Sequence, residues 1–259
     1  SEYTMDKINE YNRFEEVKDF FKIEHKVLGQ CIKTSTNFSY ADTSKELEQF
    51  RIISGVSNYI GREGVEFYPQ ELFLFEIDPD MPKRSDEIYL KNYQNDRSKH
   101  KIAAQDVLFE KKYIHPLIKG INIERWHIEE TPSFVVPFPY EESFSTRVPL
   151  KLVNLRKKAP HLAKYLVDNK KSIDAQTAYN EKIIGKREKE FYALARVGKY
   201  SFAKSYVAFR DNTKWQATVV EEVKTSWGGI KRPVFQNHAV SISEREDGNL
   251  ITSNEAHFV

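Results

Sequence analysis

The chain has 259 residues, of which 40% are hydrophobic and 13% aromatic. A chain of this length and composition folds, and it can bury a sizeable core as one large domain or two small ones. Its one cysteine, Cys31, excludes a disulfide framework and any metal site that needs several thiolates. Neither a membrane-spanning apolar run nor a signal-peptide pattern is visible, so we expect a cytoplasmic protein without a membrane partner.

The net charge of +2 hides a segregation of charge along the chain. Residues 1–90 carry 11 basic and 18 acidic side chains, whereas residues 147–204 carry 15 basic and 5 acidic ones. The remaining two segments, 91–146 and 205–259, are nearly balanced. A local basic surplus is the footprint of an element that faces phosphates, although a solvated lysine-rich helical face gives the same count.

The first 48 residues form the N-terminal segment, which we predict to be helical and linker-like. Apolar residues recur there every three to four positions, at Ile8, Tyr11, Phe14, Val17, Phe20 and Phe21. This spacing predicts a helix from about Asp6 to Ile23.

Residues 49–259 are expected to form a second region, in which strands flank a helical spacer. Short β-type runs predict strands at residues 50–54, 65–68, 72–77, 107–109, 134–138 and 148–150. Residues 151–195 read as helical, with Pro160 at a first helical position and a second helix around Ile173 to Phe191. From residue 196 onward, strands are predicted at 206–209, 215–220, 238–242 and 249–252, with a hairpin turn at Asp247-Gly248. The order indicates an α+β fold with mixed or antiparallel β-sheets and a basic helical insert.

Motifs for chemistry are scarce in this chain. The ten glycines form neither a P-loop nor a dinucleotide fingerprint, and no nucleophile elbow is present. The seven histidines lack metal-ligand spacing. The string Pro137-Phe138-Pro139-Tyr140 lacks the Asn/Asp-Pro-Pro pattern that clasps an adenine amine, so no methyl transfer is encoded here. We therefore predict no catalytic residue, no metal and no cofactor of its own.

One nuclease hypothesis stays open. Glu222-Val223-Lys224 follows an apolar strand and matches the second half of an Asp…Glu-x-Lys centre, in which carboxylates hold Mg²⁺ against a phosphate. Asp211, Asp78 or Asp80 would supply the upstream carboxylate. The triplet is weak support, because it arises by chance in a chain with 30% charged residues.

Several segments, in this order, resemble the TaqI-like specificity domain, which is the target-recognition region of adenine-N6 DNA methyltransferases and fused type II restriction–modification enzymes. The most specific segment is 114–126, which is close to the family's Pro-x-Leu-x-Gly-x-x-Ile-x-Arg-Trp signature. The others are residues 53–59 with 65–67, 135–138, 159–166, 187–196, 237–240 and 255–259, the last of which looks like the start of a helix. The sequence departs from the pattern at Ser57 or Asn58, where Thr is usual, and at Phe191, where Trp is usual.

The resemblance covers most of residues 50–259 and implies a function for them. It implies a target-recognition fold that binds double-stranded DNA sequence-specifically, in a bacterial-type restriction–modification system. It also implies that a methyltransferase catalytic domain lies in the same parent chain, that S-adenosylmethionine belongs to that domain, and that this chain is a piece of a longer enzyme. Whether the parent also cleaves DNA is left open.

Candidate DNA-binding residues divide by the part of DNA that they would contact. Phosphates would be contacted by the basic insert, through Lys157, Lys158, Lys186 and Arg187, with Lys151 and Arg156 nearby. Bases would be read by loops, which hold Ser57, Asn58, Tyr59, Lys199, Tyr200, Lys204, Ser226, Trp227, Lys231 and Arg232. Trp227 is equally well explained as an ordinary hairpin-tip aromatic. We interpret Arg125, Trp126 and Arg196 as core scaffolding, and a protein-interaction module without a nucleic-acid role remains the other alternative.

Overall fold

The computed structural model describes residues 2–4, 22–25, 28–31, 38–53, 57–78, 80–94, 102–141, 148–175, 190–210 and 216–259. The chain divides into two compact units, residues 1–57 and residues 58–259. Across the described ranges, every helix is too short or too polar to span a bilayer.

Among its described residues, the first unit holds two small hairpins and one helix. Strands β1 (Glu2–Thr4) and β2 (Lys22–His25) pair antiparallel, as do β3 (Leu28–Cys31) and β4 (Phe38–Ala41). Helix α2 (Ser44–Ile53) follows, so the strand predicted at 50–54 is wrong. The reason is a capping box, in which the Glu46 N–H donates to Thr43 Oγ1 at 3.2 Å and the Thr43 N–H donates to Glu46 Oε2 at 3.1 Å. The helix predicted over 6–23 lies outside the described residues except for Lys22 and Ile23, which belong to β2.

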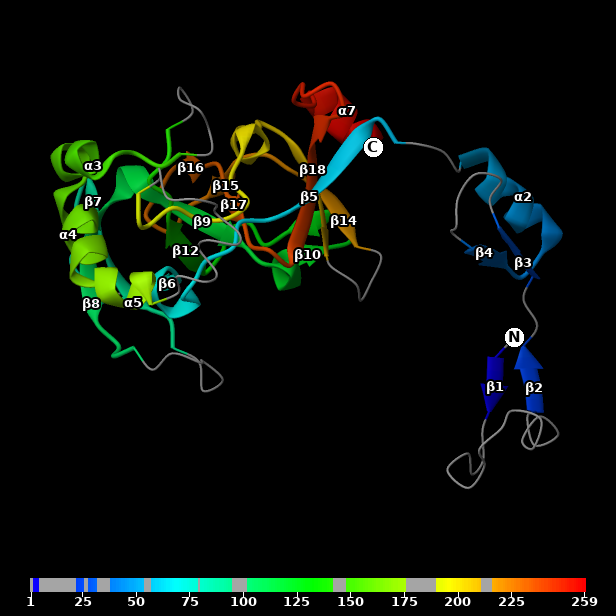
Figure 1. Cartoon of the computed structure of the whole chain (residues 1–259), viewed down its shortest axis with the longest axis horizontal. Coiled ribbons are helices and arrows are strands. Elements are labelled where there is room, and N and C mark those ends of the chain that lie inside the picture. Colours follow the sequence, from blue (N-terminus) through cyan, green and yellow to red (C-terminus); the bar gives the residue numbers. More distant parts are fainter. Residues whose placement is uncertain are drawn as a thin grey trace. The chain divides into compact units, whose positions relative to one another are not determined.

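The second unit is built on a six-stranded sheet and a four-stranded sheet (Figure 1). The six-stranded sheet has the order β17 (Val234–Phe235), β9 (Ile114–Ile118), β12 (Phe134–Pro137), β6 (Phe75–Ile77), β7 (Glu87–Asn92) and β8 (Asp106–Glu110). Its neighbours pair antiparallel, apart from the parallel pair β17 and β9. The four-stranded sheet is antiparallel throughout, in the order β14 (Ala217–Val220), β13 (Tyr206–Arg210), β18 (Ala239–Arg245) and β5 (Tyr59–Glu63).

Short elements complete this unit. Two hairpins are formed by β10 (Ile123–Glu124) with β11 (His127–Ile128) and by β15 (Val223–Lys224) with β16 (Ile230–Lys231). Single 3-10 turns lie at η3 (Gln70–Leu72), η4 (Lys111–Tyr113), η5 (Gly120–Asn122) and η7 (Lys199–Phe202). The α-helices in the described part of this unit are α3 (Leu152–Lys158), α4 (Pro160–Asp168), α5 (Lys170–Asp174) and α7 (Ser253–Phe258).

The main core lies between the six-stranded sheet and helices α3 to α5. Phe75, Phe109 and Tyr165 meet edge to face, with ring centroids 5.1 to 5.7 Å apart. Leu155, Leu162 and Leu166 join them and are fully buried. Burying each such side chain stabilises the fold by about 1.5–3 kcal/mol, so the apolar faces of these helices fix them against the sheet and leave their basic faces outside.

The structure confirms an α+β fold dominated by antiparallel pairing. The strands predicted at 107–109, 134–138, 206–209, 215–220 and 238–242 correspond to β8, β12, β13, β14 and β18, and the helix expected at Pro160 is α4. The expected turn at Gly248 is also present, with φ of +76° and its N–H donating to the Arg245 carbonyl. A helix is likewise present at the expected position near the end of the chain, as α7.

Other predicted strands are shorter than expected or absent. Residues 65–68 and 249–252 contribute only isolated bridges, and residues 72–77 begin in η3 before β6. No strand forms at 148–150, where Pro149 cannot donate to a ladder and the Leu150 N–H donates to the Pro139 carbonyl instead. Of the second predicted helix, residues 173–174 belong to α5, residues 176–189 lie outside the described ranges, and residues 190–191 are not helical, so the helix predicted to reach Phe191 does not do so.

Candidate nucleic-acid interface

The basic faces of helices α3, α4 and α5 form one candidate surface. Residues 148–175 carry seven basic and two acidic side chains. Three of these lysines are neutralised: Lys158 by Glu141, Lys164 by Asp168 and Lys170 by Asp174. Four exposed cations have no carboxylate partner among the described residues: Lys151, Arg156, Lys157 and Lys171. We call these four the helix cations.

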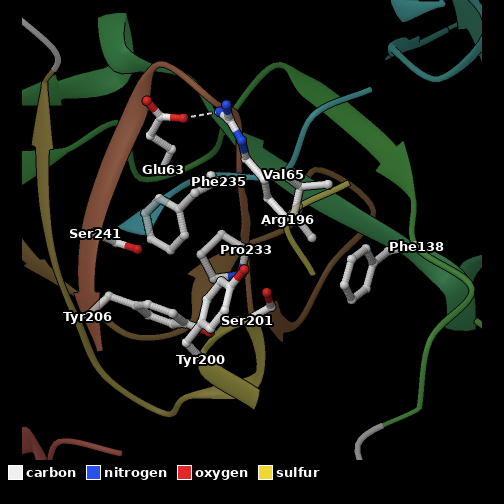
Figure 2. A pocket seen from close by; sticks show the side chains of 12 residues that line it. Glu63, Val65, Phe138, Arg196, Tyr200, Ser201, Tyr206, Pro233, Phe235 and Ser241 are labelled. Atoms are coloured by element: carbon white, nitrogen blue, oxygen red, sulfur yellow. Dashed lines mark ion pairs between the residues drawn. The ribbon is translucent and has the colours of Figure 1, made fainter. Parts of the chain in front are cut away.

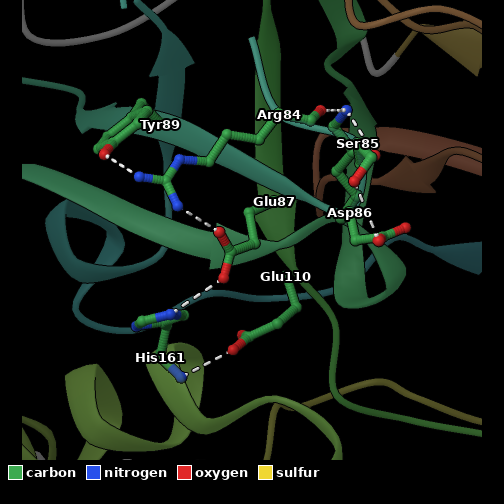
Figure 3. Close-up of polar contacts among 8 residues, drawn as sticks. Arg84, Ser85, Asp86, Glu87, Tyr89, Glu110 and His161 are labelled. Carbon is green, nitrogen blue, oxygen red and sulfur yellow. Dashed lines mark hydrogen bonds and ion pairs between the residues drawn. The ribbon is translucent and has the colours of Figure 1, made fainter. Parts of the chain in front are cut away.

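A carboxylate from the sheet fixes the start of α4. Ala159 and Pro160 offer no side-chain cap, and the Glu110 carboxylate at the end of β8 takes that role. One oxygen accepts the backbone N–H of His161 at 2.8 Å (Figure 3), and the other accepts the backbone N–H of Leu162 at 3.2 Å. Glu87 on β7 lies beside it, 3.1 Å from His161 Nε2 and 2.8 Å from Arg84. The basic helices are therefore held to the sheet by polar as well as apolar contacts.

Lys157 and Lys158, which the sequence grouped together, have different surroundings. Lys157 is exposed on α3, whereas Lys158 Nζ lies 2.7 and 2.9 Å from the two Glu141 oxygens. The hydrogen bond from Lys158 holds the pKa of Glu141 below its usual value. The charge of Lys158 is thus partly neutralised by Glu141. The other two predicted phosphate-contacting residues, Lys186 and Arg187, lie outside the described residues.

A second group of predicted residues meets at one end of the four-stranded sheet. Asn58 precedes β5, and its carbonyl accepts the Glu246 N–H at 2.9 Å; Lys199 Nζ donates to the Gly248 carbonyl at 2.9 Å. The Arg62 guanidinium lies 5.0 Å from the Tyr200 ring centroid, which packs the η7 turn against β5. Tyr59 begins β5 in register with Arg245. The turn at residues 246–248 is therefore contacted by the Asn58 backbone and the Lys199 side chain, and Tyr59 and Tyr200 lie on the strand and the 3-10 turn that these contacts join.

Two other residues from the predicted loops are exposed. Lys204 is exposed just after η7, and Ser57 is exposed as the last residue of the first unit.

In the turn between β15 and β16, Ser226 is exposed and Trp227 is half-buried. Thr225 stabilises this turn, because its hydroxyl donates to the Gly228 carbonyl at 2.7 Å. Gly228 and Gly229 have φ of +94° and +84°, a conformation that side chains rarely adopt. Trp227 packs against the main core and, with Tyr89 and Arg84, lines a groove of about 840 Å³. The Trp227 side chain is therefore packed against the core at the side of a groove, and it does not project freely from the hairpin.

Lys231 and Arg232 make contacts inside the fold. Lys231 Nζ donates to the backbone carbonyls of Lys111, Lys112 and Ile114 at 2.5 to 3.0 Å, and burial lowers the pKa of Lys231 to about 8. The Arg232 guanidinium stacks 4.7 Å from the Phe202 ring centroid. Lys231 thus joins β16 to η4 and β9, and Arg232 packs against η7.

The structure also corrects our interpretation of Arg125 and Trp126 as core scaffolding. Both are exposed at the turn between β10 and β11, and Trp126 retains 78% of its accessible surface. Sequence reasoning missed this pair because a Trp next to hydrophobic strands is usually buried. The one local signal was the polar run Glu124-Arg125-Trp126-His127, which is typical of a turn. Arg196, by contrast, is held by ion pairs with Glu63 and Glu66, as expected of a scaffold residue.

A small cavity beside Arg196 is too narrow for a ligand. Figure 2 shows Arg196 and Glu63 at its rim, with Tyr200, Tyr206 and Phe235 around it. Its volume is about 20 Å³. That volume holds about one water molecule, so the cavity is a packing feature.

The geometry gives the nuclease hypothesis no support. Lys224 Nζ lies 2.6 Å from Glu130 Oε2, and that contact lowers the pKa of the Glu130 carboxyl. Glu222 is exposed, and Asp211 lies outside the described residues. Within the part of the chain that the structure describes, no group of three His, Cys, Asp or Glu side chains could hold a metal ion.

Comparisons with known proteins add no assignment. No family model matches the chain, and no curated protein matches it significantly. Function is therefore inferred from the residues and from their geometry.

Proposed function

We propose that this chain binds double-stranded DNA as the target-recognition module of an adenine-N6 DNA methyltransferase in a restriction–modification system. The observation that carries the proposal is the set of helix cations, which are exposed on α3, at its N-cap and on α5, and are unpaired within the described residues. Unpaired surface cations on a rigid support can neutralise phosphates without first breaking an ion pair.

Base recognition in this proposal belongs to elements outside the helices. Asn58, Tyr59, Lys199 and Tyr200 lie around the 246–248 turn, where polar and aromatic side chains gather. Lys204, Ser57 and Ser226 are exposed and remain candidates. Lys231 and Arg232 are assigned a supporting role, because their cationic groups already contact carbonyls or a ring inside the fold.

The methyltransferase part of the proposal rests on the ordered sequence motifs. In it, a catalytic domain elsewhere in the parent chain binds S-adenosylmethionine and transfers the methyl group. This chain would position that domain on DNA, because phosphate contacts set register and base contacts set sequence. Its helical segment near the end, α7, occupies the position at which the motifs place a helix.

The test is neutralisation of three helix cations. The variant Arg156→Gln/Lys157→Gln/Lys171→Gln is expected to bind a 30-base-pair duplex at least tenfold more weakly at 100 mM salt, by fluorescence anisotropy. Removing three phosphate contacts should also flatten the dependence of log K on log salt by about 3.

The matched control neutralises lysines of α4 and α5 that are already paired. Lys164→Gln/Lys170→Gln removes the partners of Asp168 and Asp174, and it should change affinity less than threefold. Wild-type binding that is insensitive to salt, or absent with every duplex of a randomised pool, contradicts the proposal. Equal losses in both variants would contradict the assignment of the helix cations.

A further inference from the structure

The β10–β11 hairpin has a rigid base. Ile123 is fully buried, and Ile128 packs against the same cluster. The Asn122 side chain accepts the Lys119 N–H at 2.7 Å and donates to Glu129 Oε2 at 2.6 Å. Gly120 lies so close to β18 that an added Cβ would stand 2.8 Å from the His238 carbonyl oxygen. The hairpin therefore projects from a fixed position.

Two unfavourable features meet at the tip. Trp126 is 78% exposed, although burying a side chain of this size is worth roughly 1.5–3 kcal/mol or more. Its φ is +72°, which costs a non-glycine residue about 1 kcal/mol. The Trp126 N–H donates to the Ala217 carbonyl at 3.1 Å, so the strained tip is held in place. Strain that the surroundings maintain is typical of functional positions.

Among the charged side chains near the tip, Arg125 is the cation without an ion-pair partner in the described part of the chain. Glu124 lies 3.1 Å from His127 Nε2, Glu129 accepts from Asn122, and Glu130 pairs with Lys224. Arg125 is exposed and has no ion-pair partner in the part of the chain described. The tip thus exposes a guanidinium and an indole on consecutive residues, while the nearby carboxylates are occupied.

We propose that this hairpin is a base-reading element that enters the major groove, an inference that rests on the DNA-binding function proposed above. A two-stranded ribbon fits that groove, and Arg donates two hydrogen bonds to guanine O6 and N7. Trp126 supplies an apolar face for a thymine methyl group or a neighbouring sugar. The pair favours DNA over a protein partner, because one exposed Trp does not make the several-hundred-Å² apolar patch of a protein interface.

The test separates sequence choice from bulk affinity. The 259-residue chain is mixed with a pool of 40-base-pair duplexes whose central 16 positions are random, and the retained duplexes are sequenced. The variants are Arg125→Gln and Trp126→Asn, since Asn tolerates a positive φ. Phe258→Asn, which changes a side chain that is 86% exposed on α7, is the matched control.

We expect wild type and Phe258→Asn to enrich the same sequence. Arg125→Gln and Trp126→Asn should lose at least tenfold of that enrichment, while their affinity for the unselected pool changes less than threefold with an unaltered salt dependence. Thermal unfolding followed by circular dichroism confirms that each variant is folded, and Arg125→Gln carries the test if Trp126→Asn is not.

Failure of this inference differs from failure of the proposed function. Unchanged enrichment in both variants overturns the hairpin as a reader and leaves the proposed function intact, whereas wild-type binding without any sequence preference overturns both. A change in self-association with unchanged DNA selection, measured by sedimentation, assigns the tip to a protein contact instead and also overturns it. Absence of wild-type binding to the pool overturns the proposed function itself.

Discussion

His115 on β9 is a buried histidine whose surroundings keep it neutral. Its Nδ1 lies 3.0 Å from the Arg232 carbonyl oxygen, which can only accept, so Nδ1 carries the proton. Burial, and then the nearby Lys231 charge, lower the pKa of His115 to about 3. The side chain therefore supports the core as a neutral donor.

This lowered pKa predicts a pH dependence of stability. Between pH 6.5, the ordinary pKa, and pH 3, the unfolded chain binds a proton at this residue and the folded chain does not. Stability is therefore lost as the pH falls through this window, by up to about 1.4 kcal/mol per pH unit. His115→Asn should remove that component, so its free energy of unfolding by urea should fall less steeply between pH 6.5 and 4.5. Equal slopes in the two proteins would mean that His115 titrates normally in the folded state.

At the scale of one element, α4 depends on a cap from another part of the chain. Glu110 satisfies two N–H groups at the start of the helix, where a negative charge also interacts favourably with the helix dipole. We expect Glu110→Ala to lower the free energy of unfolding by about 1–2 kcal/mol and Glu110→Gln by about 1 kcal/mol. Urea denaturation measures both.

Glu87 provides the control for this prediction, because it contacts only side chains at the same place. Glu87→Gln weakens the contacts with His161 and Arg84, which are partly exposed and should be worth less than about 1 kcal/mol. If Glu87→Gln destabilised the protein as much as Glu110→Ala, the capping role of Glu110 would be refuted.

Elements with local signals could be predicted from the sequence, and elements that depend on distant partners could not. Pro160 and the apolar face of Leu162, Tyr165 and Leu166 predict α4, which the structure confirms. The strand predicted at 50–54 was wrong although the Thr43–Glu46 capping box was present in the sequence. Pro149 likewise argued against a strand at 148–150.

The candidate site shows the same limit. The basic surplus of residues 147–204 was visible in the sequence, but which lysines stay unpaired depends on contacts such as Lys158 with Glu141. Lys231 was predicted to face DNA, yet its ammonium contacts carbonyls nearly 120 residues earlier in the chain. The exposure of Trp126 depends on a positive φ and on a contact with Ala217, and neither follows from local sequence.

For the whole molecule, the distribution of charge matters more than its sum. A net charge of +2 would give weak attraction to DNA if charge were spread evenly. Salt screens interactions beyond about 8 Å at physiological ionic strength, so a phosphate responds to the cations beside it and hardly to acidic residues elsewhere. The strength of DNA binding should therefore follow the positive charge near the helix cations and not the net charge of the whole chain.

An exchange of charges that conserves the total tests this directly. Lys157→Glu reverses one helix cation, and Glu222→Lys adds a cation at an exposed position between β14 and β15. The double variant keeps the net charge of +2. We expect it to bind a 30-base-pair duplex as weakly as Lys157→Glu alone, about tenfold below wild type, because the added charge lies outside the phosphate-contacting surface. Recovery of wild-type affinity in the double variant would show instead that total charge governs binding and that the helix cations have no special place in it.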